Sequence, residues 1–320
     1  MRILVTGATG FVGGALVHRL ASDPRFRTRA AVRLDDSSLP PGVERARVAS
    51  VGAHSDWREA LSGVDVVVHA AARVHVMRER DADTLGEFRR VNTAGSLNLA
   101  RQAAIAGVRR FVFISSIKVN GESTPIDRPY TADDTPAPAD PYGVSKHEAE
   151  QGLHELARLT GLEVVIIRPV LVYGPGVKAN FRSMLVWLHR GIPLPLGALS
   201  NRRSLVALDN LVDLVFRCIT HPAAANETFL VSDGEDLSTS DLLKRAARAL
   251  GTSARLVPVP AAILMVATRL LGKGSVGDRL CGSLCVDITK TCALLGWSPP
   301  VDVDAALAST GAYFLEHQAE

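Results

Sequence analysis

Cysteine is scarce in this chain of 320 residues, which contains four. Cys281, Cys285 and Cys292 lie close together in the sequence, whereas Cys218 stands apart. No CxxC pair and no Cys/His ligand spacing forms among them. We therefore expect reduced, packed cysteines and neither a disulfide framework nor a metal site.

The sequence also lacks any run of like charge. Lys and Arg total 36 and Asp and Glu total 33, which gives a formal net charge of +3. The arginines are interleaved with acids along the chain, so nucleic acid is not the expected partner. A few well-placed cations could still bind a phosphorylated small molecule.

Neither a leader peptide nor a membrane span is predicted. The chain opens directly on the strand-like run MRILV, without the charged and apolar regions of a signal peptide. Residues 260–271 form the most apolar later stretch, but they include Arg269 and fall short of the roughly 20 apolar residues that cross a bilayer. We expect a cytoplasmic protein and a buried or interfacial helix over this stretch, with a membrane-surface role as the less favoured alternative.

The first half of the chain alternates short β-branched runs with longer helical patterns, as is typical of βαβ units and a parallel sheet. Right-handed crossovers between such units favour a doubly wound α/β fold of the Rossmann type. Strands are expected over residues 3–6, 29–33, 46–48, 64–69, 111–115 and 164–168, and helices over residues 11–21, 56–61, 83–106 and 141–159.

Prolines and glycines interrupt this pattern after Arg168-Pro169. A chain of this length exceeds what one hydrophobic core usually serves. We therefore predict a dinucleotide-binding domain over residues 1–168 and a smaller α/β substrate lobe over residues 169–320, some elements of which return to the first domain. Helices in this second part are expected over residues 180–190, 209–220, 238–250 and 302–316.

A glycine turn, GATGFVG at residues 7–13, follows the first apolar strand and opens an amphipathic helix. Gly7 permits a tight turn, Gly10 lets a pyrophosphate approach the backbone, and Gly13 allows close helix packing. Backbone amides at the helix start attract the anion. Cofactor contacts are therefore predicted at Gly7, Thr9, Gly10, Phe11, Val12 and Gly13.

The end of the second expected strand bears on the choice of cofactor. An acid there would hold the adenosine ribose of NAD, but the chain has Arg33. A guanidinium suits a 2′-phosphate, so Arg33 favours NADP(H) over NAD(H). A solvated arginine at a strand end is the alternative interpretation.

Asp140 and Pro141 predict the start of a helix that carries Tyr142 and Lys146 four residues apart on one face. A tyrosine with an ordinary pKa of about 10 is a poor acid–base catalyst at neutral pH. A nearby ammonium and the positive end of the helix dipole would lower that pKa. We predict that Tyr142 and Lys146 are a catalytic pair that moves a proton on a carbinol oxygen.

The linked motifs GxxGxxG and YGVSK resemble those of the extended short-chain dehydrogenases in the NAD-dependent epimerase/dehydratase family. The resemblance implies that Lys146 also holds the cofactor ribose and that Ser116, in preference to Ser115, binds the substrate oxygen beside Tyr142. It further implies cofactor contacts at Ala70, Ala71, Ala72 and Pro169.

Four other positions are considered together with this resemblance. Asn92 is expected to bridge backbone segments, and His69 and His75 are expected to be ordinary strand-end and loop residues. Many relatives carry Asp near position 50, where this chain has Ser50, so the adenine contact stays open.

Residues 168–176 read RPVLVYGPG and resemble the crossing into the substrate domain of sugar-nucleotide epimerases and dehydratases. Residues 201–210, NRRSLVALDN, resemble the segment that places an arginine on the substrate diphosphate. The resemblance implies a UDP-sugar as partner and a homodimer formed through the helices over 83–106 and 141–159. The implied substrate residues are Ser116, Asn180, Arg203 and Arg279.

Within the family, the sequence most resembles a branch that is found in bacterial O-antigen and polysaccharide gene clusters. This similarity implies NAD(P)H-dependent reduction of the C4 keto group of a UDP-linked 4-keto-6-deoxy-N-acetylhexosamine, giving UDP-N-acetylquinovosamine. A UDP-hexose 4-epimerase with tightly bound NAD is the alternative, and a non-catalytic sensor or scaffold is a minor one. Dehydration is disfavoured, because Ile117-Lys118 follow Ser116 where a dehydratase commonly needs a glutamate.

Overall fold

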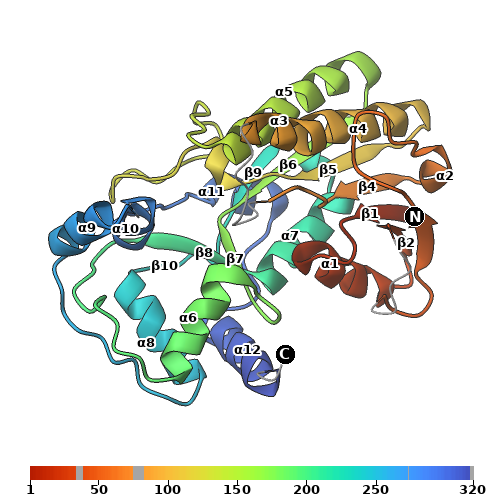
Figure 1. The fold of residues 1–320 in the computed structure, drawn as a ribbon. Helices are drawn as coiled ribbons and strands as arrows, with labels where there is room; N and C mark the ends of the chain where they lie inside the picture. Colours follow the sequence, from red (N-terminus) through yellow and green to blue (C-terminus); the bar gives the residue numbers. More distant parts are fainter. Residues whose placement is uncertain (34–38, 75–82, 273, 318–320) are drawn as a thin grey trace.

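The computed structural model describes residues 1–33, 39–74, 83–272 and 274–317. A seven-stranded sheet in the order β3-β2-β1-β4-β5-β6-β9 forms its centre (Figure 1). Every strand pair in this sheet is parallel. The strands are β1 (Arg2–Thr6), β2 (Arg27–Val32), β3 (Glu44–Arg47), β4 (Val66–His69), β5 (Arg110–Ile114), β6 (Glu163–Pro169) and β9 (Thr228–Val231).

Helices cover both faces of the sheet, because the central strands are apolar on both sides. In β1, Ile3 and Val5 pack into one core, while Leu4 points into the other. Figure 1 shows α1 (Phe11–Ala21) and α7 (Leu208–Thr220) on one side and α4 (Ser96–Ile105) and α5 (Pro141–Thr160) on the other. The predicted doubly wound α/β class is confirmed, with the strand order reversing between β1 and β4.

The helix expected over residues 83–106 forms in three parts. It begins as α3 (Thr84–Phe88), passes through a π-helical turn (Arg89–Gly95) and ends as α4. The wide turn contains Asn92, whose side chain is buried. π-turns inside helices commonly mark functional sites, because the extra residue redirects a side chain or a carbonyl group.

The second part of the chain builds a small sheet and its own core. The order β10-β8-β7 combines β7 (Leu171–Tyr173), β8 (Arg203–Ala207) and β10 (Asp236–Leu237). A third cluster of apolar side chains packs this sheet against the surrounding helices. These helices are α6 (Ala179–His189), α8 (Thr239–Ala249), α9 (Ala261–Leu270), α10 (Gly274–Cys281) and α12 (Val303–Glu316).

The chain returns to the large sheet after it has built the small one. β9 pairs with β6, α7 packs against α1, and α11 (Thr289–Leu295) lies against β9. β6 itself ends at Pro169, one residue past the expected boundary. The division into residues 1–168 and 169–320 stays a prediction; if it holds, β9 and α7 belong structurally with the first domain.

The helix expected within residues 260–271 forms as α9, but none of its residues is buried. Of the two expectations, a buried or an interfacial helix, the buried one is therefore wrong for this element, and the interfacial one stays a prediction. Within the described residues, no helix combines the length and the apolarity that crossing a bilayer requires.

Candidate active site

The glycine turn is built as tightly as its sequence predicts. Gly7 has a positive φ of 67°, and a Cβ there would stand 2.8 Å from the backbone nitrogen of Ala71. A Cβ at Gly13 would stand 2.1 Å from the Gly7 carbonyl oxygen, so only glycine lets α1 pack this close. Gly10 begins α1 without a side-chain cap, which leaves amides of the first turn available to an anion.

The other predicted cofactor residues surround this turn. Thr9 is exposed, and Phe11 and Val12 are half-buried in the first turn of α1. The strand-end segment Ala70–Ala72 is half-buried beside the turn, and the Ala71 amide donates to Thr6 Oγ1 at 3.2 Å. Pro169 is buried at the end of β6. Arg33 is exposed directly after β2, next to residues that lie outside the described part of the chain.

Tyr142 and Lys146 lie in the first two turns of α5, which begins as expected. Asp140 caps the helix by accepting a hydrogen bond from the Gly143 amide at 2.6 Å, and Pro141 occupies the first turn. The Lys146 side chain is 1% exposed, and its Nζ donates to the Ile114 carbonyl oxygen at 2.8 Å. The end of β5 thus holds the lysine against the sheet.

Burial changes the proton affinities of this pair in opposite directions. It raises the pKa of Tyr142 above its ordinary value, and the Asp140 carboxylate raises it further. Burial lowers the pKa of Lys146 to about 7, with Glu150 opposing the shift. The expectation that the surroundings lower the pKa of Tyr142 is therefore not met by the protein groups alone. Without a bound ligand the phenol of Tyr142 is therefore neutral, whereas Lys146 is divided between its charged and neutral forms near pH 7.

Ser115 and Ser116 occupy different environments at the end of β5. Ser115 is buried, and its Oγ donates to Glu150 Oε1 at 2.5 Å. Ser116 is half-buried, and its Oγ accepts a hydrogen bond from the Lys118 amide at 3.2 Å. The Ser115 hydroxyl is committed to the interior, so Ser116 is the better placed of the two to meet a substrate.

Lys118 joins the turn that carries Ser116 to the start of the helix that carries Tyr142. Its Nζ forms an ion pair with Asp140 and a second one with Glu122 at 3.0 Å. A Cβ at Gly143 would stand 2.7 Å from the Lys118 carbonyl oxygen, so the two backbones touch. This connection was not predicted from the sequence, where Lys118 served only to disfavour dehydration.

A buried ion pair lies one helical turn beyond Lys146. Glu150 is 2% exposed and pairs with Arg168 of β6 at 2.6 Å. Arg168 Nη1 also donates to Asn120 Oδ1 at 3.0 Å. The sequence signal was the spacing Tyr142, Lys146, Glu150, which places all three on one helix face, but only the tertiary structure supplies the partners.

His69 and Asn92 have structural partners, in line with what was expected of them. His69 is fully buried, and its two ring nitrogens lie 2.7 Å from Thr6 Oγ1 and 2.9 Å from Ser96 Oγ. Burial lowers the pKa of His69 to about 3, so its ring is neutral. The Asn92 amide group exchanges hydrogen bonds with the Arg73 backbone and donates to Ser145 Oγ. His75 lies outside the described residues.

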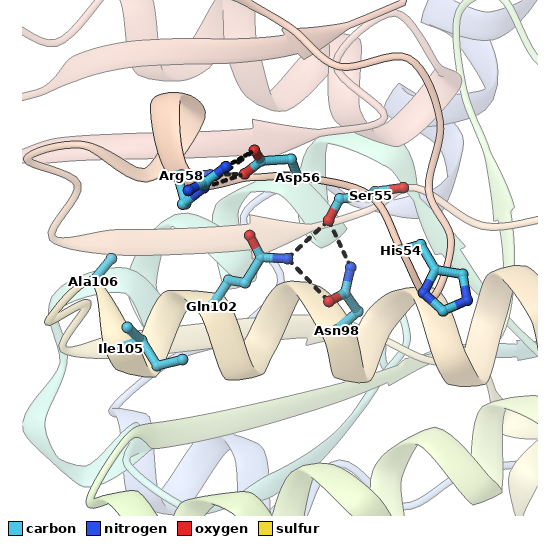
Figure 2. Close-up of a pocket in the computed structure, with 8 residues that line it drawn as sticks. All are labelled: His54, Ser55, Asp56, Arg58, Asn98, Gln102, Ile105 and Ala106. Atoms are coloured by element: carbon cyan, nitrogen blue, oxygen red, sulfur yellow. Dashed lines mark hydrogen bonds and ion pairs between the residues drawn. The ribbon is translucent and has the colours of Figure 1, made fainter.

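Two cavities are lined by residues of the segment that follows β3. One, of about 730 Å³, follows β3 and is lined by Val48, Ser50 and Arg90 among others. It contains Ser50, the position at which the adenine contact was left open. The other, of about 520 Å³, lies between α4 and the loop before α2 (Arg58–Leu61). Figure 2 shows that Asn98 and Gln102 line this second cavity and bind the Ser55 carbonyl oxygen, so their amides are already occupied.

The predicted substrate residues separate into two places. Arg203 in β8 donates from Nη1 to the carbonyl oxygens of Arg279 and Gly282 at 3.0 and 3.1 Å. Burial lowers the pKa of Arg203, and the Arg279 cation contributes less. Asn180 is exposed at the start of α6, a helix that packs against α8. The structure therefore brings Arg203 and Arg279 together and gives Asn180 no hydrogen bond to either among the described residues.

Comparison with known proteins assigns this site to a family. A model of the NAD dependent epimerase/dehydratase family matches residues 3–232. The chain belongs to this family. Members of the family are enzymes that depend on a nicotinamide dinucleotide, and this chain is one of them, so the sensor or scaffold alternative falls away.

One relative and two solved structures of similar fold match nearly the whole chain. A UDP-glucose 4-epimerase from Vibrio cholerae is 47% identical over 98% of this chain and 95% of its own. A UDP-glucuronic acid 4-epimerase from Bacillus cereus, solved with NAD, has a TM-score of 0.80 at 21% identity and 99% coverage of both chains. A UDP-glucose 4-epimerase from Thermotoga maritima, solved with UDP-glucose, has a TM-score of 0.77 at 23% identity and covers 100% of both chains.

The expectation of a C4-ketoreductase is wrong. The relative with 47% identity is a 4-epimerase, which supports the alternative that the sequence left open. A reductase and an epimerase use the same serine, tyrosine and lysine on the same oxygen, so the motifs alone could not separate them.

Proposed function

We propose that this enzyme interconverts UDP-hexoses that differ in configuration at C4. The observation that carries the proposal is the 47% identity to a UDP-glucose 4-epimerase over nearly the whole chain. Support from the site is the placement of Tyr142 and Lys146 in the first turns of α5, beside the strand end that carries Ser116.

The residues at the glycine turn fit a bound dinucleotide. A Cβ at Gly7 or Gly13 would collide with backbone atoms, and the start of α1 offers its amides to a pyrophosphate. When bound, the dinucleotide supplies reversible hydride acceptance from C4, so that epimerisation consumes no reducing equivalent. Gly7, Thr9, Gly10, Phe11, Val12, Gly13, Ala70, Ala71, Ala72, Tyr142, Lys146 and Pro169 are the proposed contacts.

Tyr142 is the proposed acid–base group. Its phenol oxygen takes the proton from the C4 hydroxyl and later returns it to the same oxygen after the sugar has presented its other face. Ser116 holds that oxygen by a hydrogen bond. A proton-accepting Tyr142 needs a lower pKa than burial gives it, and positive charge brought by the cofactor and by protonated Lys146 acts in that direction.

The substrate diphosphate is proposed to lie on Arg203 and Arg279. Arg203 donates hydrogen bonds from Nη1 to the carbonyl oxygens of residues 279 and 282, and these bonds fix the orientation of its guanidinium group. A fixed guanidinium recognises phosphate oxygens directionally. Asn180 remains a weaker proposed contact from α6.

In this proposal, Arg33 decides the preference between NADP(H) and NAD(H). Arg33 is exposed at the end of β2, where a guanidinium can face a 2′-phosphate. We retain the preference for NADP(H) as a prediction, tested by fluorescence titration with NADH and NADPH. Clearly tighter NADH binding reverses it. The proposed homodimer through α3, α4 and α5 is tested separately by light scattering.

One experiment decides the reaction. The purified enzyme is incubated with UDP-glucose or UDP-N-acetylglucosamine and no added cofactor, and NMR follows the C4 epimer. Catalytic formation of the epimer, with dinucleotide released on denaturing the protein, is the expected result. Absence of the epimer together with stoichiometric oxidation of NAD(P)H by a UDP-4-keto sugar contradicts the proposal.

A further inference from the structure

A row of buried polar side chains runs from the end of β1 to the N-terminal part of α5. Each is no more than 1% exposed, and their order along the row is Thr6, His69, Ser96, Asn92 and Ser145. Each residue is hydrogen-bonded to the next. A buried polar group costs free energy unless it is paired, and apolar side chains would fill this space without that cost. Packing alone therefore does not explain the polar row.

The polar row joins two segments on which the site depends. At one end, Thr6 Oγ1 accepts a hydrogen bond from the Ala71 amide at 3.2 Å, within the segment proposed to contact the cofactor. At the other end, Ser145 Oγ donates to the Tyr142 carbonyl oxygen at 2.8 Å. Asn92 of the π-helical turn links the row to this end, with its Nδ2 3.1 Å from Ser145 Oγ. The strand end beside the glycine turn is thus connected to the helix that carries Tyr142.

The direction of each hydrogen bond at His69 follows from the number of protons available. Ser96 has one hydroxyl proton, which it donates to the Asn92 carbonyl oxygen at 2.6 Å, so it can only accept from His69. The donor is therefore His69 Nε2, which lies 2.9 Å from Ser96 Oγ. A neutral ring carries one N–H, which leaves Nδ1 bare to accept the Thr6 hydroxyl proton at 2.7 Å. A single tautomer satisfies both sides of the ring.

The surroundings of His69 keep its ring neutral. Burial lowers the pKa of His69 to about 3, and the Lys146 cation acts in the same direction. The ring stacks on Phe113, its partner in the next strand, with the ring centroids 5.9 Å apart. Lys146 Nζ lies 4.3 Å from the centroid of the same Phe113 ring. His69 therefore also supports the aromatic ring against which Lys146 packs.

We propose that His69 and Thr6 are positioning residues for the cofactor and for Tyr142. They hold the Ala71 segment, the π-helical turn and the start of α5 in one arrangement, through hydrogen bonds that run in fixed directions. Both side chains are buried, so they act on the ligands only through these neighbours. The inference rests on the proposed cofactor contact at Ala71 and on the proposed role of Tyr142. Its measurable consequence is weaker dinucleotide binding and slower turnover when the row is broken at Thr6.

The first test compares two substitutions at Thr6. Thr6→Val removes the hydroxyl and keeps the shape of the side chain, whereas Thr6→Ser keeps the hydroxyl. In a fluorescence titration we expect Thr6→Val to raise the dissociation constant of the dinucleotide about tenfold, because the Ala71 amide loses its acceptor. It should lower kcat for the UDP-hexose by about tenfold to a hundredfold with little change in KM, since the reacting groups are misplaced. Thr6→Ser should restore both values.

Thr28→Val is a matched control, because it makes the same change at a buried threonine of the same sheet. Thr28 is 4% exposed in β2, beside Ile3 of β1, and its hydroxyl has no hydrogen-bond partner among the described residues. Thr28→Val should leave the dissociation constant and kcat as they are. The comparison separates the loss of the Thr6 hydrogen bonds from a general effect of placing valine at a buried strand position.

The second test observes the tautomer of His69 without any reaction. Long-range proton–nitrogen correlation spectra distinguish a ring protonated at Nε2 from one protonated at Nδ1, and the pattern that disappears in His69→Asn is assigned to His69. We expect the Nε2–H pattern, unchanged across the neutral pH range because the pKa lies far below it. In Thr6→Val the Nδ1 resonance should shift, since its hydrogen bond is lost.

Three outcomes overturn the inference. One is a His69 ring that is charged or protonated at Nδ1. Another is a dissociation constant for Thr6→Val that equals that of Thr28→Val, and the third is an equal loss in Thr6→Ser, which assigns the effect to packing. A protein with the expected tautomer and the expected loss of dinucleotide affinity that forms no C4 epimer contradicts the proposed reaction and supports the positioning role.

Discussion

Helices α5 and α9 depart from the usual distribution of side chains in opposite ways. α5 buries charge, with Lys146 at 1% and Glu150 at 2% exposure. α9 exposes aliphatic residues and buries none of its residues, with Leu270 at 83% exposure. Both departures cost free energy in the isolated chain, because buried charge loses hydration and exposed leucine orders water.

The two helices differ in whether these side chains have partners inside the protein. Buried charge on α5 has partners inside the protein: Lys146 has the Ile114 carbonyl oxygen, and Glu150 has Arg168 and Ser115. Exposed apolar surface on α9 has no such partner among the described residues. The informative observations in a fold are these two, a buried polar group and an exposed apolar patch.

The largest effect is expected from Tyr142→Phe. Removing the hydroxyl that is proposed to move the C4 proton should lower turnover of the UDP-hexose about a thousandfold, because general acid–base catalysis contributes 10²–10⁴-fold. Thermal melting should be nearly unchanged. Tyr313→Phe on α12, where the side chain is 38% exposed, is the control. Near-normal turnover by Tyr142→Phe would move the acid–base role to another group.

The buried ion pair on α5 is tested by Glu150→Gln. This change leaves the Arg168 charge buried without a counterion, and we expect it to lower the free energy of unfolding by about 3–5 kcal/mol in urea. The double variant Glu150→Leu/Arg168→Met should be more stable than Glu150→Gln, because no charge is left unpaired. A double variant that is less stable would show that the pair itself, and not the orphaned charge, dominates.

Lys146→Met tests the cost of the buried ammonium. The pKa of Lys146 is lowered to about 7 in the folded chain, against about 10.4 when unfolded. Between these values the unfolded chain binds the extra proton, so the stability of the unmodified protein rises with pH across this window and is lowest below pH 7. The methionine variant should therefore be more stable by ~2 kcal/mol in urea at pH 6, and the gain should shrink by pH 9.5. A gain that does not change with pH contradicts the assignment.

A smaller effect is expected from Lys118→Met, at the junction of the segments that carry Ser116 and Tyr142. The Asp140 carboxylate raises the pKa of Tyr142, and Lys118 pairs with that carboxylate. Loss of the ammonium should raise the pKa of Tyr142 further, and the acid limb of the kcat/KM profile should move up by about half a unit to one unit. Lys118→Arg should restore the limb. Glu122→Gln removes the other partner and should leave the profile in place.

The smallest effect is expected for an exposed aliphatic side chain of α9. Leu270→Ser should change the free energy of unfolding by no more than about 0.5 kcal/mol, because the side chain packs on little. Leu153→Ala on α5, at a residue with 0% exposure, should cost about 2–5 kcal/mol. Equal costs in the two variants would mean that α9 is covered in solution.

Local sequence was sufficient for much of the site. The glycine turn and the first turn of α5 depend on neighbours within a few residues, so Gly7, Asp140 and Pro141 could be read directly. The partners of Lys118 and Glu150 could not, because Asp140 and Arg168 are 22 and 18 residues away along the chain. The choice between reductase and epimerase also lay outside the motifs.

The sequence by itself determined the order of strands and helices in the first half, the glycine turn and the face of α5 that carries Tyr142 and Lys146. These features follow from hydrophobic periodicity and from backbone preferences that act over a few residues. Only the tertiary structure decided that β9 returns to the large sheet, that Tyr142 is buried enough to raise its pKa, and that α9 turns its leucines outward. Burial depends on which distant segments pack together, and apolar spacing in a helix is the same whether its face meets a core or a membrane.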